Sequence, residues 1–305
     1  MGILGSLVLT SHGVNFVPSA PKPKQLLAFL MTNANELVRA SDCIVELWGA
    51  RPPKSVMSTL QTYVLHIRQI LRSAAPVDRS DILVTRNQGY QLVTGTDHFD
   101  RFRFERLVWA ARWCVSVGDD ERASDFFAAA LGLWRGPALA DVRPGRLSMT
   151  HVVELAEVRN AVVEQRIEAD LRLGRHEELL DELSTRVSLH PTHENACAQY
   201  MVALYRSGDR DRALAAFERL RQVLGDTLGI EPAPPIRRLR HAILTADAVL
   251  DLNRRPPRRE HPRVPSTVGG EPPTPPDDRA YLRRHPRRRP VPAWSDPPRS
   301  RTHHA

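Results

Sequence analysis

An apolar stripe in residues 54–72 constrains the fold of this chain more than any other feature. The stripe residues follow one another at spacings of 4, 4, 3 and 4, which places them on one face of a helix: Val56, Leu60, Val64, Ile67 and Leu71. The remaining positions are mostly polar, so the pattern predicts an amphipathic helix that packs one side against a core.

A short hairpin pattern follows this helix. Residues 82–85 and 90–93 alternate in character, and Asn87 and Gly89 between them favour a turn. We expect Arg86 at the tip, and one apolar face on the hairpin, made by Ile82, Val84, Tyr90 and Leu92. A helix followed at once by such a hairpin is typical of a winged DNA-binding domain.

The residues before the helix complete this pattern. Residues 3–10 and 14–17 predict two strands, and residues 23–31 predict a first helix. A second helix is expected to begin at Ser41, an N-cap residue, and to end at Gly49. The order of strands, three helices and a hairpin predicts a winged helix-turn-helix domain over residues 1–98, with the third helix as its recognition helix.

The side of the third helix opposite the stripe is polar without being densely charged, and Gln69 belongs to it. Hydroxyl, amide and imidazole groups can hydrogen-bond base edges in a major groove, and arginine and lysine can bind phosphates. The expected base contacts are Ser58, Thr59, Thr62, Tyr63 and His66. The expected phosphate contacts are Lys54, Arg68 and Arg72. Arg86 is expected to enter a narrow minor groove. A plain amphipathic helix with a solvated face is the alternative.

Residues 99–253 read as one helix after another. Gly118, Gly174 and Gly208 fall between the helical patterns, and Gly174 and Gly208 are 34 residues apart, which is the tetratricopeptide period. An insertion around residues 136–148 breaks the period. The segment therefore predicts an all-α, TPR-like and irregular helical array, and the whole chain is expected to be mainly α.

The positive charge lies at the C-terminal end. Residues 254–305 contain 13 of the 25 prolines and carry a formal charge of +8, which equals that of the whole chain. Such a segment buries too little apolar surface to fold, so it predicts a disordered basic tail. The charge of the chain therefore says nothing about DNA binding by the folded part.

Several classes of protein are disfavoured by what the sequence lacks. It contains no phosphate-binding loop, no dinucleotide-binding turn and no His-Glu-x-x-His motif, so we expect no enzyme, no catalytic residue, no metal and no cofactor. The three cysteines, Cys43, Cys114 and Cys197, are far apart and odd in number, which favours buried thiols in a reducing cytoplasm. The apolar runs are too short to cross a bilayer, which predicts a soluble protein without a membrane partner.

Particular strings also resemble a known family. Residues 22–30, 46–49, 60–64 and 84–90 are similar to the OmpR/PhoB-type DNA-binding domain, and more closely to that of the SARP family, the Streptomyces antibiotic regulatory proteins. The run 129–141, which contains Leu-Trp-Arg-Gly-Pro-Ala-Leu, and Leu-Gly-Ile-Glu-Pro at 228–232 resemble the bacterial transcriptional activation domain of the same family. The resemblance covers roughly residues 1–250.

The resemblance implies a transcriptional activator of an antibiotic or secondary-metabolite gene cluster. Such a protein would bind direct repeats in double-stranded promoter DNA, associate with a second copy there and recruit the RNA polymerase holoenzyme, in the cytoplasm at the nucleoid. Two alternatives stay open at this point. The helical array could serve as a protein-interaction scaffold, or the same DNA-binding domain could belong to a repressor.

Overall fold

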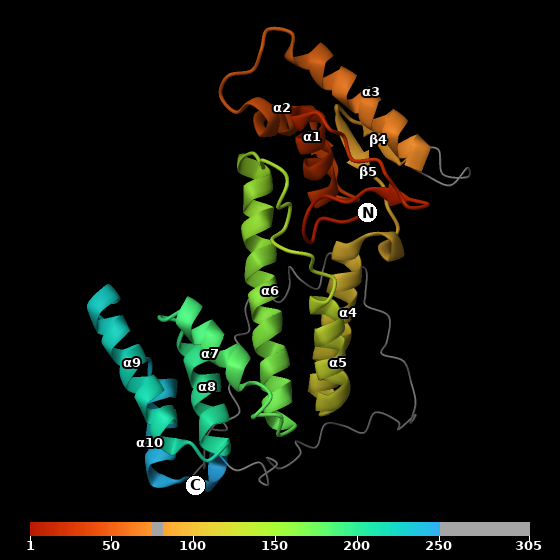
Figure 1. Cartoon of the computed structure of the whole chain (residues 1–305). Helices are drawn as coiled ribbons and strands as arrows, with labels where there is room; N and C mark the ends of the chain where they lie inside the picture. The colour runs from red at the N-terminus through yellow and green to blue at the C-terminus, as the bar shows by residue number, and fades with distance from the viewer. Residues whose placement is uncertain (75–81, 251–305) are drawn as a thin grey trace, which may run out of the picture. The chain divides into compact units, whose positions relative to one another are not determined.

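The computed structural model describes residues 1–74 and 82–250, and the chain divides into two compact units (Figure 1). Unit 1 contains Met1–Trp109 and Phe126–Val162, and unit 2 contains Ala110–Asp125 together with the chain from Val163 onward. Most described residues are helical, which confirms the predicted mainly-α class. The predicted disordered tail, residues 254–305, lies outside the described residues.

The N-terminal segment does not form the long strand expected over residues 3–10. The structure has only β1 (Thr10–Ser11) and β2 (Val14–Asn15), with an isolated bridge between Gly2 and Val8. Ile3 and Leu4 are fully buried. Their carbonyl groups accept hydrogen bonds from the amides of Leu139, at 3.1 Å, and Arg135, at 2.8 Å. The predicted strand was wrong because its backbone partners come from a distant loop.

Asp100 holds this segment in place. It is the first residue of α4 (Asp100–Val117) and is only 7% exposed. Its carboxylate accepts hydrogen bonds from the amides of Ile3 (2.9 Å) and Leu4 (3.1 Å), and from the guanidinium of Arg135 (3.0 Å). Unit 1 therefore includes the start of α4 and the loop after α5 (Asp120–Leu131). The predicted domain boundary after residue 98 stays a prediction.

The next elements are α1 (Pro21–Thr32), β3 (Leu37–Arg39) and α2 (Ala40–Trp48), so both expected helices are confirmed. Nine of the α1 residues are buried, which makes this helix the centre of the unit 1 core. The predicted N-cap of α2 was wrong. The cap position is Arg39, whose backbone is extended because it ends β3, and Ser41 lies inside the helix. Gly49 ends α2 at φ 60°, as expected.

The third helix and the hairpin form as predicted, with one difference in phase. They are α3 (Val56–Ala74), β4 (Leu83–Arg86) and β5 (Gly89–Leu92), and β5 lies between β3 and β4 in one antiparallel sheet. Leu83 pairs with Leu92 and Thr85 with Tyr90. The buried face therefore uses Leu83, and the expected alignment of Ile82 and Val84 with Tyr90 and Leu92 was off by one residue. The turn itself sets this register, because Asn87 and Gln88 both have positive φ, 41° and 62°.

Glu46 links α2 to the beginning of α6 (Arg146–Arg172) inside unit 1. Its buried carboxylate accepts hydrogen bonds from the amides of Gly145 (2.7 Å), Leu147 (3.0 Å) and Ser148 (3.1 Å). These amides are the ones that a helix start leaves without an internal partner. A β-carbon at position 145 would collide with the backbone carbonyl of Glu46, so the close approach requires glycine there.

Unit 2 contains the expected helical array. After the C-terminal part of α6 come α7 (Leu180–Leu189), α8 (Glu194–Arg206), α9 (Arg210–Leu228) and α10 (Pro234–Thr245). Helix α8 packs against both α7 and α9. Glycines at positive φ end helices where predicted, at 118, 174 and 208. Helix α10 was not predicted from the sequence; its first turn contains two prolines, at positions that tolerate them.

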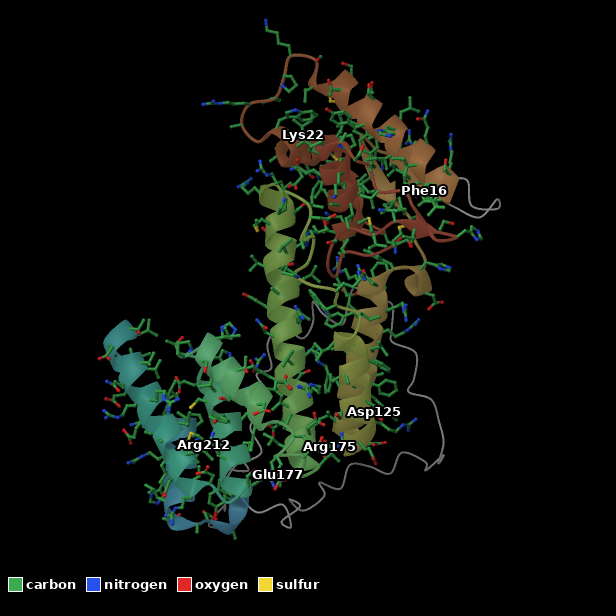
Figure 2. All side chains as sticks on the ribbon, in the orientation of Figure 1. Phe16, Lys22, Asp125, Arg175, Glu177 and Arg212 are labelled. Carbon is green, nitrogen blue, oxygen red and sulfur yellow. The ribbon has the colours of Figure 1, made fainter. Side chains whose placement is uncertain are left out.

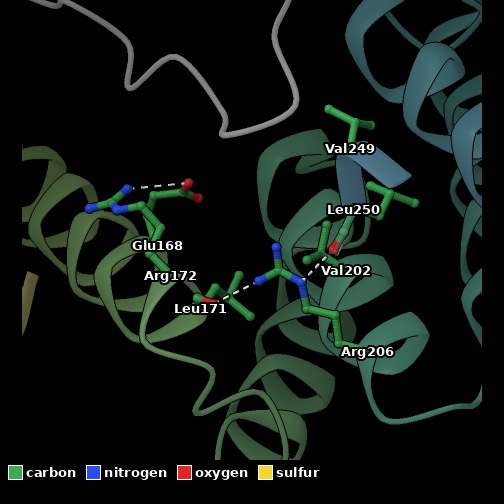
Figure 3. Close-up of a pocket in the computed structure, with 7 residues that line it drawn as sticks. All are labelled: Glu168, Leu171, Arg172, Val202, Arg206, Val249 and Leu250. Carbon is green, nitrogen blue, oxygen red and sulfur yellow. Dashed lines mark hydrogen bonds and ion pairs between the residues drawn. The ribbon is translucent and has the colours of Figure 1, made fainter. Parts of the chain in front are cut away.

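A small hollow lies beside Arg206 in unit 2 (Figure 3). The guanidinium of Arg206 donates hydrogen bonds to the carbonyl oxygens of Leu171 (2.7 Å) and Leu250 (3.0 Å). These bonds tie α8 to the end of α6 and to the short 3-10 helix Ala248–Leu250. The hollow therefore lies where α6, α8 and the 3-10 helix pack together, and the hydrogen bonds of Arg206 connect the three segments.

The three cysteines are buried and free, as expected. Burial raises the pKa of Cys43 and of Cys197 to about 12. Because a thiol reacts as the thiolate, we expect neither to react with a disulfide reagent such as DTNB at pH 8 in the folded protein. Both should react within seconds after unfolding in guanidinium chloride. Fast reaction of either thiol without denaturant would contradict this burial.

Asp141 is expected to make unit 1 sensitive to acid. Burial raises its pKa, but the hydrogen bonds from Lys24 (2.7 Å) and the Leu7 amide (2.7 Å) and the Lys24 charge outweigh this, so the pKa lies below 3.8. A lowered pKa stabilises the fold above the unfolded value, and the contribution is lost as pH falls through the folded value. Asp141→Asn should cost about 0.5 kcal/mol at pH 7, since the pair is partly exposed.

Urea unfolding at pH 7 and at pH 3 tests this expectation. The difference between the wild type and Asp141→Asn should shrink at the lower pH. Replacement of the exposed Asp226 with asparagine is the matched control and should show no such pattern. An equal difference at both pH values would contradict the assignment.

Candidate nucleic-acid interface

One side of α3 is buried in unit 1, and the opposite side is exposed along the length of the helix; we call this exposed side the outward face. Its stripe residues Leu60, Val64, Ile67 and Leu71 are between 0% and 2% exposed, so this side of the helix faces the core of unit 1. Figure 2 shows the side chains that project from α3 on the other side. The predicted base-reading residues belong to this helix, and their exposure decides which of them a ligand could reach.

Three of them are exposed, on or beside the outward face: Ser58, Thr62 and His66. They follow one another at intervals of four residues and therefore lie one turn apart. The hydroxyl of Ser58 donates to the Ser55 carbonyl (2.9 Å), and that of Thr62 donates to the Ser58 carbonyl (3.0 Å). With their protons used inside the helix, both oxygens present lone pairs outward, as acceptors for a base amino group.

Thr59 and Tyr63 are half-buried and lie at the edge of this face. The Thr59 hydroxyl donates to the Ser55 carbonyl at 3.0 Å. The Tyr63 ring stacks on Trp48, with 6.1 Å between ring centroids and 16° between planes. Tyr63 thus helps to hold the end of α2 against α3. Base contacts by Thr59 and Tyr63 stay predictions.

Among the predicted phosphate ligands, Lys54 and Arg72 are exposed near the two ends of α3. Arg68 is half-buried and bridges α3 to the hairpin. Its guanidinium donates to the Leu83 carbonyl (3.0 Å) and to the Thr85 hydroxyl (2.6 Å). Arg68 therefore positions the hairpin relative to α3, and a phosphate contact by this residue stays a prediction.

Arg86 is the last residue of β4 and is exposed beside the turn of the hairpin. It pairs with Gly89 across the ladder, so only Asn87 and Gln88 lie beyond it. This is the position expected for the tip of a wing. Arg68 connects β4 to α3, so the hairpin and α3 are joined by side-chain hydrogen bonds within unit 1.

The sequence that forms this face has more basic than acidic residues, although residues 1–253 together are nearly neutral. Residues 47–77 contain no aspartate or glutamate, and they include the basic residues Arg51, Lys54, Arg68 and Arg72. Residues 82–96 of the hairpin region also contain no acidic residue. A local excess of basic groups around exposed hydroxyl and imidazole side chains suits a polyanion.

The outward face also contains two residues that are not among the predicted base or phosphate contacts. Gln61 and Leu65 are both exposed, and with Gln69 they form a second row of side chains on successive turns. A helical wheel centred opposite the buried stripe would have included them.

Other kinds of site find no support in the part of the chain that the structure describes. Within residues 1–74 and 82–250, no three histidine, cysteine, aspartate or glutamate side chains are grouped as metal ligands would be. No helix in these ranges has the length and apolar character needed to cross a membrane.

Comparison with known proteins places the chain among transcriptional regulators. Residues 15–92 match the family described as "Transcriptional regulatory protein, C terminal", and residues 99–244 match the "Bacterial transcriptional activator domain". The regulatory protein DnrI of Streptomyces peucetius is 42% identical over 257 residues, which cover 83% of this chain and 94% of that protein. The regulatory protein AfsR of Streptomyces coelicolor is 34% identical over 252 residues, but these cover only 24% of its length.

A solved structure has the same architecture. The structure of Mycobacterium tuberculosis EmbR in complex with a low-affinity phosphopeptide matches with a TM-score of 0.76 and 32% identity, over 80% of this chain and 64% of that one.

The winged helix followed by a helical activator domain defines a transcriptional regulator. The chain belongs to the SARP family, the Streptomyces antibiotic regulatory proteins, as the resemblance implied.

Proposed function

We propose that the chain is a sequence-specific DNA-binding transcriptional activator that binds direct repeats in promoter DNA. The observation that carries the proposal is the outward face of α3, with exposed Ser58, Thr62 and His66 and with Arg86 on the hairpin beside it. In this arrangement α3 enters the major groove, and Arg86 reaches the adjacent minor groove. Lys54 and Arg72 bind phosphates on either side.

The chemistry of the two contact regions differs in what it recognises. The hydroxyl oxygens and the imidazole on α3 meet base edges, which distinguish one sequence from another. The basic groups meet phosphates, which every sequence shares, and they make binding sensitive to salt. Specific recognition therefore depends on α3, and affinity for DNA in general depends on the basic residues around it.

Direct repeats in the promoter would place two copies of the chain head to tail on one face of the duplex. We further propose that the promoters belong to an antibiotic or secondary-metabolite gene cluster, in keeping with the relative DnrI. The bound copies would recruit RNA polymerase holoenzyme through residues 99–244, which match the bacterial transcriptional activator domain. A repressor would use the same DNA-binding surface but would lower transcription.

The triple substitution of Ser58, Thr62 and His66 with alanine tests the DNA-binding proposal. We expect specific affinity for a selected promoter duplex to fall at least about 100-fold, since three base contacts of about 1 kcal/mol or more each add up to about 3 kcal/mol. Affinity for unrelated duplex DNA should change little, because the phosphate contacts remain. Fluorescence anisotropy with both duplexes measures the ratio of the two affinities.

The matched control replaces the exposed Thr185, Ser188 and His190 of unit 2, which have the same side-chain types. This variant should bind both duplexes like the wild type. Equal specificity in the wild type and the α3 triple variant would refute the assignment of α3. Run-off transcription with purified polymerase then separates an activator, which raises the transcript yield, from a repressor, which lowers it.

A further inference from the structure

Leu65 is an exposed apolar side chain in the middle of the outward face of α3. Its side chain is 55% exposed, although Val64 and Ile67 beside it are buried. One turn before it lies Gln61 and one turn after it lies Gln69, both exposed. Leu65 is therefore flanked by amides on the surface that the proposed function places against DNA.

An isolated exposed leucine needs no explanation on an ordinary surface. On a helix that enters a major groove, however, its chemistry is restrictive. A leucine can neither donate nor accept a hydrogen bond, so it leaves unpaired any base amino or carbonyl group that it covers. The C5-methyl group of thymine is the apolar group that the four bases display in the major groove. A methyl–methyl contact there removes apolar surface from water on both sides.

We propose that Leu65 determines sequence specificity by contacting the methyl group of one thymine in each half-site. The inference rests on the proposed function, since it requires α3 to lie in the major groove. Gln61 and Gln69, one turn away on each side, are suited to bidentate contacts with adenine. These two contacts would fix the position of α3 in the groove, so that Leu65 lies over the base pair between the two adenines. The chain should therefore select thymine at one defined position of the site.

Replacement of thymine by deoxyuridine tests the proposal, because it removes the methyl group and keeps base pairing. The full-length chain is first used to select bound sequences from random duplex DNA. Each thymine of the selected site is then changed to deoxyuridine in turn. Loss of one buried methyl should weaken wild-type binding about fourfold at a single position of the half-site. The Leu65→Ala variant should bind the thymine and deoxyuridine duplexes equally there.

The control is Val14→Ala, which shortens an apolar side chain of matching exposure (54%) on β2 of the same unit. It should retain the fourfold response. Thermal unfolding should show equal stability for Leu65→Ala and the wild type, because the side chain is exposed. A wild type indifferent to every deoxyuridine, a half-site without thymine, or an unchanged response in Leu65→Ala would overturn this proposal and leave DNA binding intact. Failure to select any sequence would overturn the proposed function and this inference together.

Discussion

Replacing Glu46 with alanine is expected to destabilise unit 1 by about 3 kcal/mol. The carboxylate is 2% exposed and accepts hydrogen bonds from the amides of Gly145, Leu147 and Ser148. Alanine offers no acceptor, and three amides at the beginning of α6 lose their partner together. Each buried donor left unpaired costs about 1–3 kcal/mol, although water that enters the space will recover part of this.

Two measurements check the expectation. Urea unfolding followed by circular dichroism gives the change in the free energy of unfolding. Hydrogen exchange at the Leu147 and Ser148 amides gives the local effect, and both should exchange at least about 100-fold faster in Glu46→Ala. Glu46→Gln keeps one acceptor oxygen and should lose about half as much stability.

The matched control is Glu154→Ala. This glutamate is exposed on α6, and its carboxylate makes a weak contact with the His151 imidazole, with 3.5 Å between Oε2 and Nδ1. Its cost should stay within about 0.5 kcal/mol. If Glu46→Ala were as stable as this control, the cap on α6 would have no energetic role. The link between the helix-turn-helix and α6 would then have to come from apolar packing alone.

Replacing Arg86 with alanine is expected to weaken binding to the selected promoter duplex about tenfold. The guanidinium is exposed at the hairpin tip, on a hairpin that Arg68 holds against α3. A narrow minor groove concentrates negative potential, so an inserted arginine gains more there than at the duplex surface. The slope of log affinity against log salt should also fall in magnitude by about one, because one phosphate-neutralising charge is lost.

Anisotropy titrations at three salt concentrations measure both quantities. Arg86→Lys keeps the charge but is more strongly hydrated, so we expect it to restore the salt slope and only part of the affinity. Arg143→Ala removes an exposed arginine elsewhere in unit 1 and should leave both quantities unchanged. Wild-type affinity together with a wild-type slope in Arg86→Ala would remove the wing from the interface.

Local spacing was enough to predict most of the helices and the exposure of several proposed contact residues. The stripe from Val56 to Leu71 predicts α3 because a helix buries one face whatever it packs against. The turn glycines at 118, 174 and 208 follow from a backbone conformation that favours glycine. The exposure of Ser58, Thr62 and His66 follows in turn, because their positions lie away from the stripe.

Features that depend on a partner elsewhere in the chain could not be predicted in this way. The register of β4 on β5 depends on a turn at Asn87 and Gln88, both at positive φ, and a shift of one residue exchanges the two faces. Arg68 has the positive charge that a phosphate ligand needs, but in the folded chain its guanidinium donates hydrogen bonds to β4. The exposed fraction of Leu65, 55%, is set by how α3 packs in the folded chain.

The winged-helix pattern therefore comes from local sequence, whereas the extent of the unit that contains it comes from tertiary structure. Ile3 and Leu4 are held by Asp100, and Glu46 caps residues 145–148, about a hundred positions away. A fragment that ends at residue 98 lacks all of these partners. Periodicity reports which face of a helix is buried, but a hydrogen bond between distant residues leaves no periodic signal. Only the folded chain shows that the helices of the winged-helix region belong to the same compact unit as the start of α6.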